Sequence, residues 1–145
     1  MITPQIVQGG IFTDERGILT HCNELDMTEV ERFYVIKHPD KSVIRAWHAH
    51  QDERKWFYAT KGSFTIAIVK IDDWDNPSPT LQPEIYTLSE GDSRVLCVPK
   101  GYANGIKAME DDSALLVFSG KRMPEALLDS WRYDKNMWVD WSLFE

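Results

Sequence analysis

Short segments rich in β-branched and aromatic residues alternate with turn residues along most of the chain. The segments that we predict to be strands are residues 31–37, 42–48, 54–60, 63–71, 84–88, 94–98 and 113–119. Val, Ile, Phe, Tyr and Trp suit a pleated and partly buried surface, whereas Gly, Pro, Asn and Asp favour the turns between strands. At least six short strands, spaced about 8–12 residues apart with no helical periodicity between them, predict an all-β antiparallel sandwich or barrel.

The carboxy-terminal part of the chain departs from this pattern. Pro124 is followed by Glu-Ala-Leu-Leu, and proline suits a first helical position, so we predict a short helix over residues 124–131. The tail also carries four large aromatic side chains, Trp131, Trp138, Trp141 and Phe144. It is too apolar to hang in solvent, so we expect it to pack on the barrel or on a second subunit. Cover for the core is favoured over stacking on a ligand.

Composition and charge narrow the class of protein. A chain of 145 residues suits one domain, and its 43% apolar and 12% aromatic shares exclude disorder. No apolar run approaches the roughly 20 residues of a membrane-spanning helix, and the amino-terminal segment has no secretory character. The net charge of −7 argues against general binding of nucleic acid or anionic membranes, although a local basic pocket can still hold a small anion. Cys22 and Cys97 suggest neither a disulfide framework nor a zinc site, so we expect a single cytoplasmic domain, residues 1–145.

The tripeptide His48-Ala49-His50 is the most informative motif. Side chains alternate along a strand, so both imidazoles are expected on one face, about 6–7 Å apart. A single H-x-H pair is commoner on a surface strand than in a functional site. Here a charged cluster at residues 52–55 follows, then Gly62, and later a Pro-x-Gly turn at residues 99–101. The combination favours a functional site.

The stretch from His48 to Gly62, taken with residues 91–92 and 99–104, resembles the two conserved blocks of the cupin superfamily. That resemblance implies a double-stranded β-helix, or jelly-roll barrel. Metal-binding cupins take two histidines and a glutamate from the first block and a third histidine from the second.

This chain departs from the metal-binding pattern at two ligand positions. Arg54 or Lys55 occupies the glutamate position, and Asn104 occupies that of the third histidine. A divalent ion needs three or four N, O or S ligands, so we predict a site with no metal and no other cofactor. Glu53 comes one position early and is expected on the opposite face of the strand, unless a bulge turns it inward.

Further motifs appear in the order found in dTDP-4-dehydrorhamnose 3,5-epimerases, which are RmlC-like cupins. They are residues 13–17 (TDERG), 45–48 (RAWH), Lys55, residues 78–80, residues 98–105 and the segment 131–141. The Arg-x-x-His-Ala-His form and residues 32–37 resemble still more closely a sister group, the dTDP-4-keto-6-deoxyhexose 3,4-ketoisomerases. The resemblance therefore implies an isomerase that acts on a nucleoside-diphosphate 4-keto-sugar, in deoxysugar or surface-polysaccharide synthesis.

Carried over by position, the resemblance implies a catalytic group. His48 matches the base that removes a proton alpha to the C4 ketone, and Asp134 is its expected carboxylate partner. Lys55 matches a lysine near the developing enolate oxygen, and His50 matches the second histidine of the ketoisomerases. The chemistry agrees, because histidine is the usual base near neutral pH and a fixed ammonium stabilises an enolate.

The same resemblance implies substrate-binding residues. Arg16 and Arg45 match cations near the diphosphate or sugar, and arginine forks suit a diphosphate even on an acidic protein. Asn104 stands where the epimerases have another histidine. Tyr102, beside the second block, is placed with this group.

The proton-returning acid of the epimerases has no direct counterpart. The epimerases use a tyrosine on the strand after the second block, where this chain has Phe118. A phenylalanine ring cannot donate a proton, so Tyr34 and Tyr102 are the candidate replacements. A 3,4-ketoisomerase moves its proton between neighbouring carbons on one face and can dispense with that tyrosine.

Two other functions remain open from the sequence. One is a non-catalytic cupin that binds nucleotide sugars or carbohydrates. The other is a metal-dependent cupin enzyme using His48, His50, Glu53 and one more ligand. In each case we expect a homodimer, because an exposed Trp-rich tail is unusual for a monomer.

Overall fold

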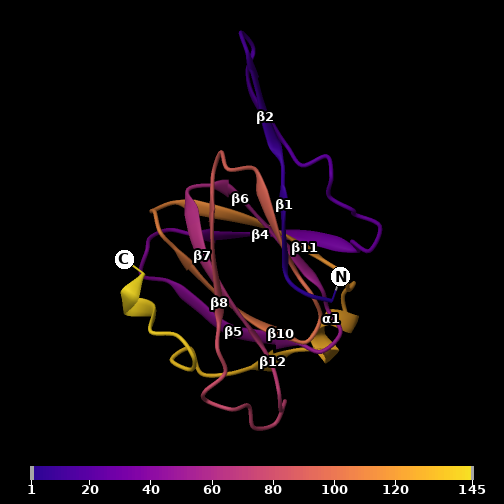
Figure 1. Ribbon diagram of the computed structural model, residues 1–145, viewed down its shortest axis with the longest axis vertical. Helices are drawn as coiled ribbons and strands as arrows, with labels where there is room; N and C mark the ends of the chain where they lie inside the picture. Colours follow the sequence, from indigo (N-terminus) through magenta and orange to yellow (C-terminus); the bar gives the residue numbers. More distant parts are fainter. Residues whose placement is uncertain (1, 145) are drawn as a thin grey trace.

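Two antiparallel sheets face each other in the computed structural model, which describes residues 2–144 (Figure 1). The first sheet has the order β1 (Gln5–Gln8), β9 (Arg94–Val98), β6 (Lys55–Lys61), β11 (Ser113–Ser119) and β4 (Arg32–His38). The second has the order β12 (Trp131–Arg132), β5 (Ile44–His50), β10 (Tyr102–Ala108), β7 (Ser63–Lys70) and β8 (Glu84–Ser89). The predicted all-β barrel is confirmed.

Strand β7 is apolar along nearly its whole length because both of its faces are buried. In β7 every side chain except that of Lys70 is buried. Phe64 and Ile66 point between the two sheets, whereas Ala67 and Val69 belong to a second cluster on the outer face of the same sheet. Both faces of β7 are therefore covered, which removes the alternation of a half-exposed strand.

The carboxy-terminal tail covers that outer face, as the favoured alternative predicted. In Figure 1 the yellow end of the chain runs along β5, β12 and β10. The Trp47 ring lies 5.2 Å from that of Trp138 and 5.7 Å from that of Trp141, between ring centroids. Gly105 permits this approach, because a Cβ there would lie 2.6 Å from the Trp141 ring. The tail is thus part of the core rather than a free extension.

The helix is shorter than predicted. Only α1 (Glu125–Leu128) is helical, followed near the end of the chain by the 3₁₀ turn η1 (Trp141–Leu143). Asp129 is the residue that follows α1, and its carboxylate accepts hydrogen bonds from the backbone N–H groups of residues 51–53. Among residues 2–144, no helix is long and apolar enough to cross a membrane.

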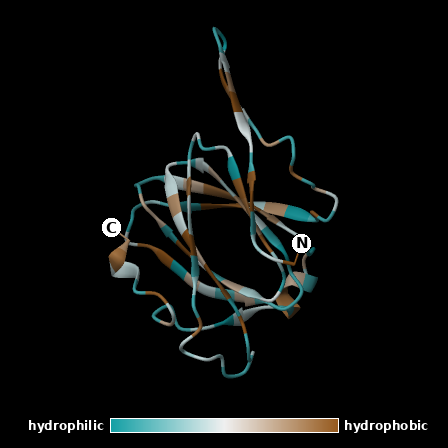
Figure 2. Cartoon of the chain, in the orientation of Figure 1, coloured by the Kyte–Doolittle hydropathy of each residue, from teal (hydrophilic) through white to brown (hydrophobic). Residues whose placement is uncertain are grey.

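The sequence pattern missed five strands: β2 (Gly10–Asp14) and β3 (Gly17–His21) outside the two large sheets, and β1, β10 and β12 within them. Strands β2 and β3 form a hairpin that projects away from the barrel (Figure 1). Figure 2 shows apolar residues along this hairpin as well as along the barrel strands. Within the barrel, β10 was read only as a motif, because its Tyr-Ala-Asn-Gly start has low strand propensity.

Candidate active site

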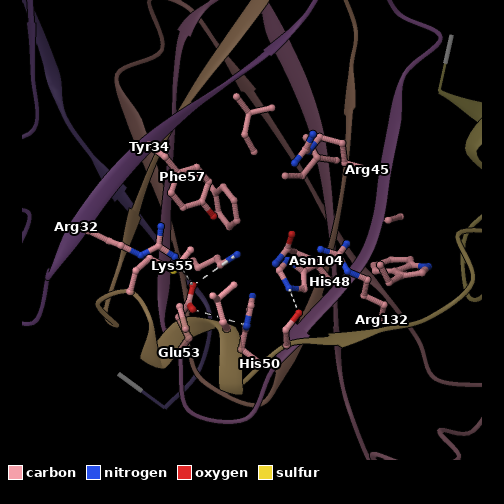
Figure 3. Close-up of a pocket in the computed structure, with 18 of the residues that line it drawn as sticks. Arg32, Tyr34, Arg45, His48, His50, Glu53, Lys55, Phe57, Asn104 and Arg132 are labelled. Atoms are coloured by element: carbon pink, nitrogen blue, oxygen red, sulfur yellow. Dashed lines mark hydrogen bonds and ion pairs between the residues drawn. The ribbon is translucent and has the colours of Figure 1, made fainter.

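The space between the two sheets opens into a cavity of about 530 Å³ (Figure 3). One wall comes from β4 and β6, and the other from β5, β10 and β12, closed by the segment around α1. Its polar lining consists of Arg32, Tyr34, Arg45, His48, His50, Glu53, Lys55, Asn104, Ser130 and Arg132. Cations outnumber carboxylates in this lining, so the cavity suits an anionic ligand.

Six of the nine predicted site residues line this cavity. They are His48, His50, Lys55, Tyr34, Arg45 and Asn104. The two imidazoles lie with ring centroids 4.2 Å apart, on the same face of β5 as the strand period requires. Asn104 lies directly opposite His48 on β10. Two positions apart on β4, Arg32 and Tyr34 both point into the cavity.

His48 is oriented by Ser130 rather than by Asp134. The Nε2 atom of His48 lies 2.9 Å from Ser130 Oγ. Asp134 is exposed, and its carboxylate accepts a hydrogen bond from the backbone N–H of Asn136. The predicted pairing fails because Tyr133 exchanges backbone hydrogen bonds with Trp47, which carries residue 134 past the edge of β5.

The neighbours of His50 determine which of its two ring nitrogens carries the proton. Its Nδ1 atom lies 2.7 Å from the backbone carbonyl oxygen of Asp129. A carbonyl oxygen only accepts, so Nδ1 donates the hydrogen bond and, in the neutral ring, Nε2 is unprotonated. Nε2 is buried and has no hydrogen-bond partner among residues 2–144. His50 therefore presents a bare basic nitrogen inside the barrel.

Both imidazoles are neutral near pH 7. Burial, followed by the charges of His50 and Lys55, lowers the pKa of His48 from 6.5 to about 3. Burial and the charge of Lys55 lower the pKa of His50 to about 3 as well. A neutral imidazole can accept a proton from a substrate, so the site holds two available bases.

These shifts predict acid sensitivity. His38 is also buried and its pKa is lowered, first by desolvation and then by Arg45. Below pH 6.5 the unfolded chain binds protons at these positions that the folded chain does not, so stability rises with pH in this range. Between pH 6.5 and 5 the free energy of unfolding should fall by up to about 1.4 kcal/mol per pH unit for each of His48 and His50, whose pKa values are lowered to about 3, and His38 should add to this fall. Urea unfolding across that range measures the slope; a His38→Leu variant should show a shallower one, and a flat profile would contradict the prediction.

Glu53 lines the cavity, contrary to the expectation that it faces the other way. Strand β5 ends at His50, and residues 51–54 turn before β6 begins, so strand alternation does not apply to them. The Glu53 carboxylate lies 3.7 Å from Lys55 Nζ and 3.9 Å from Arg32 Nη2. It forms the centre of an ion-pair cluster on the β4–β6 wall.

Arg16 and Tyr102 do not line the cavity of their own chain, and neither does Phe118. Arg16 lies at the tip of the β2–β3 hairpin, 80% exposed, and pairs with Asp14. Tyr102 faces inward two residues from Asn104 but is enclosed in the apolar core. Phe118 packs on the outer face of β11, against Phe33 and other apolar side chains. Tyr34 is thus the tyrosine that reaches the cavity, and its ring lies 5.7 Å from Lys55 Nζ.

The donor set does not fit a divalent metal. Within residues 2–144, no group of three or more His, Cys, Asp and Glu side chains is arranged to hold a metal ion. The carboxylate of Glu53 faces two cations, Lys55 and Arg32. With these two cations already 3.7 and 3.9 Å from its carboxylate, Glu53 is poorly placed to bind a divalent metal ion as well.

Arg32, Ser130 and Arg132 are cavity residues that the sequence analysis missed. Arg32 carried a usable signal, because it precedes Tyr34 by two positions on one strand. Ser130 and Arg132 gave no local signal. Arg132 reaches the cavity because β12 pairs with β5, which places it opposite His48.

The Ser130 contact can be separated from the predicted Asp134 contact by mutation. For the keto-sugar isomerase that the sequence resemblance implies, Ser130→Ala should lower turnover about threefold to tenfold, because the imidazole of His48 loses its hydrogen-bond partner. Asp134→Asn should leave turnover unchanged, since its carboxylate contacts the tail backbone. Steady-state kinetics of the two variants makes the comparison. A larger loss in Asp134→Asn would restore the His48–Asp134 pairing.

Known proteins share features with this chain in both sequence and fold. The model of the FdtA family, described as WxcM-like, C-terminal, matches residues 4–126. A probable low-salt glycan biosynthesis epimerase, Agl13 of Haloferax volcanii, is 28% identical over 113 residues, covering 74% of this chain and 70% of that protein.

Solved structures share the fold at low sequence identity. The rmlC epimerase of Mycobacterium tuberculosis superposes with a TM-score of 0.78 at 20% identity, covering 97% of this chain and 74% of the other. A mutant of the 3,4-ketoisomerase QdtA from Thermoanaerobacterium thermosaccharolyticum, in complex with TDP-4-keto-6-deoxyglucose, has a TM-score of 0.69 at 20% identity, with coverages of 92% and 89%. These likenesses confirm the predicted jelly-roll fold of RmlC-like cupins.

Proposed function

The chain belongs to the FdtA family (WxcM-like, C-terminal), and on this basis we propose that it is a sugar-nucleotide isomerase. Its substrate would be a nucleoside-diphosphate 4-keto-6-deoxyhexose, and its reaction would begin with metal-free removal of the proton alpha to the C4 ketone. The observation that carries the proposal is the meeting of two neutral imidazoles with the Lys55 ammonium in one cationic cavity.

Each part of the cavity has a role in this chemistry. His48 accepts the carbon-bound proton, and Ser130 holds its ring. Lys55 stabilises the oxygen that becomes negative as the enolate forms. Arg45 and Arg132, on the opposite wall, are placed to bind the diphosphate (Figure 3).

We favour 3,4-ketoisomerisation over 3,5-epimerisation because it needs no proton return on the opposite face of the sugar. At the position of the epimerase tyrosine this chain has Phe118, which points away from the cavity. Tyr34, on the β4 wall, is the remaining candidate acid for an epimerase reaction. In a 3,4-isomerisation, His48 takes the proton from C3 and returns it to C4 on the same face. The hydroxyl proton moves from O3 to O4, and the bare Nε2 of His50 is able to relay it. The ketone thereby moves from C4 to C3 with no net gain or loss of protons.

We also propose that the product serves surface-glycan synthesis and that the chain acts as a homodimer. The Haloferax relative is a probable low-salt glycan biosynthesis epimerase, which supports the first proposal. The projecting hairpin supports the second, because Ile18 and Leu19 are more than half exposed on it. In such a dimer, Arg16 at the hairpin tip would be able to reach the cavity of the partner subunit. Light scattering tests the dimer, and a monomer at micromolar concentration would contradict it.

The function is tested by incubating the protein with TDP-4-keto-6-deoxyglucose in deuterated buffer and following the sugar by NMR. The expected result is a 3-keto product, with exchange confined to positions 3 and 4. Exchange at C5 would instead indicate a 3,5-epimerase. Binding of TDP without turnover or exchange, over a panel of keto-sugar nucleotides, would favour the non-catalytic alternative and overturn the proposal.

A further inference from the structure

Glu53 is the one carboxylate among the described residues that line the cavity, and its setting is unusual. Its side chain is 1% exposed, and neither carboxylate oxygen has a hydrogen-bond partner within residues 2–144. Lys55 Nζ at 3.7 Å and Arg32 Nη2 at 3.9 Å lie beside Oε2, and His50 Nδ1 lies 3.8 Å from Oε1. A buried carboxylate needs compensating charge, so Glu53 acts here as a counter-ion.

The backbone holds Glu53 in this place. The N–H groups of Gln51, Asp52 and Glu53 donate to the carboxylate of Asp129 at 2.7, 2.8 and 3.0 Å. Three such bonds to one carboxylate lock the turn between β5 and β6 against the segment after α1. The backbone of Glu53 is therefore fixed beside the cavity, and its side chain enters the cavity from a rigid support.

The cations of the cavity fall into two unlike pairs (Figure 3). Lys55 and Arg32, on the β4–β6 wall, share the negative charge of Glu53. Arg45 and Arg132, on the opposite wall, have no carboxylate within 4 Å in the part of the chain that the structure describes. A diphosphate is drawn to the uncompensated pair and repelled by Glu53 from the other.

We propose that Glu53 is a positioning residue that reserves Lys55 for the keto oxygen of the substrate. Its carboxylate holds Lys55 and Arg32 on their wall and neutralises part of their charge, so the diphosphate binds at Arg45 and Arg132. Lys55 also faces the Tyr34 ring, at 5.7 Å from its centroid, and the two imidazoles, which are neutral near pH 7. This inference rests on the proposed isomerase function.

The test is the isosteric variant Glu53→Gln, with two readouts that should move in opposite directions. Turnover should fall about 10- to 100-fold, because Lys55 is no longer held for the substrate oxygen. Affinity for TDP should rise roughly threefold to tenfold, because the cavity loses its negative charge. In a Lys55→Met background, Glu53→Gln should change turnover by less than about threefold, since the two residues act together.

Glu29→Gln is the matched control, because Glu29 pairs with Arg54 outside the cavity; it should match the wild type in both readouts. Unchanged turnover and TDP affinity in Glu53→Gln would overturn the inference. Reduced turnover with weaker TDP binding would assign Glu53 a purely structural role and overturn it too. If the wild type binds TDP but converts no keto sugar, the proposed function fails, and the direction of the TDP effect alone supports or overturns charge compensation by Glu53.

Discussion

Replacing His48 by asparagine should reduce turnover of TDP-4-keto-6-deoxyglucose by at least about 1,000-fold, in the range expected for loss of a general base. Asparagine keeps a polar group opposite Asn104 and beside Ser130, but it cannot accept a proton at neutral pH. TDP affinity should stay within about threefold of the wild type, because the cationic side chains are retained. Single-turnover kinetics and calorimetry measure the two quantities.

The control for this prediction is His21→Asn, which changes a histidine on β3, outside the cavity. It should turn over substrate like the wild type. A His48→Asn variant that keeps more than about a tenth of wild-type turnover would contradict the role of His48 as base. His50, the neighbouring neutral imidazole, would then be the group to test next.

Replacing Lys55 by methionine should lower turnover about 100- to 1,000-fold, the usual effect of removing one donor to a developing oxyanion. Methionine preserves much of the length and the apolar contacts of the lysine stem. Loss of the ammonium leaves the buried Glu53 carboxylate with Arg32 as its nearest cation, so the variant should also be less stable, and its folding is checked by circular dichroism beside the kinetics. We expect the loss in kcat, with little change in KM, because the enolate charge develops only during reaction.

Lys61→Met is the matched control, since Lys61 ends the same strand in an exposed position. Equal losses in the two variants would mean that the effect comes from β6 as a whole. A Lys55→Met enzyme with wild-type kcat and a raised KM would place Lys55 at the diphosphate, and would contradict both its oxyanion role and the function of Glu53 proposed above.

Local patterns predicted much of the barrel. Residues 113–119 were predicted as a strand and coincide with β11, because their apolar and β-branched side chains suit a buried position. Strand β10 escaped detection because the Ala-Asn-Gly stretch near its start has little preference for a strand. It is extended because β5 and β7 hydrogen-bond to it on either side, which no local pattern reveals.

Some residues of the candidate site could likewise be predicted from local pattern, and others could not. Side-chain alternation placed His48 and His50 on one face, and it holds for Arg32 and Tyr34 on β4. Alternation failed for Glu53, which lies just beyond a strand end, where a turn changes the direction of every side chain. No local pattern points to Ser130, because it comes from a distant part of the chain.

The amino-acid sequence by itself determined the all-β fold and the two inward-facing imidazoles, since both follow from the local period of a strand. Only the tertiary structure decided what those imidazoles contact. His48 meets Ser130 across 82 positions, and His50 meets the Asp129 carbonyl across 79. Such contacts depend on how the carboxy-terminal segment packs against β5, and that packing is a property of the whole folded chain.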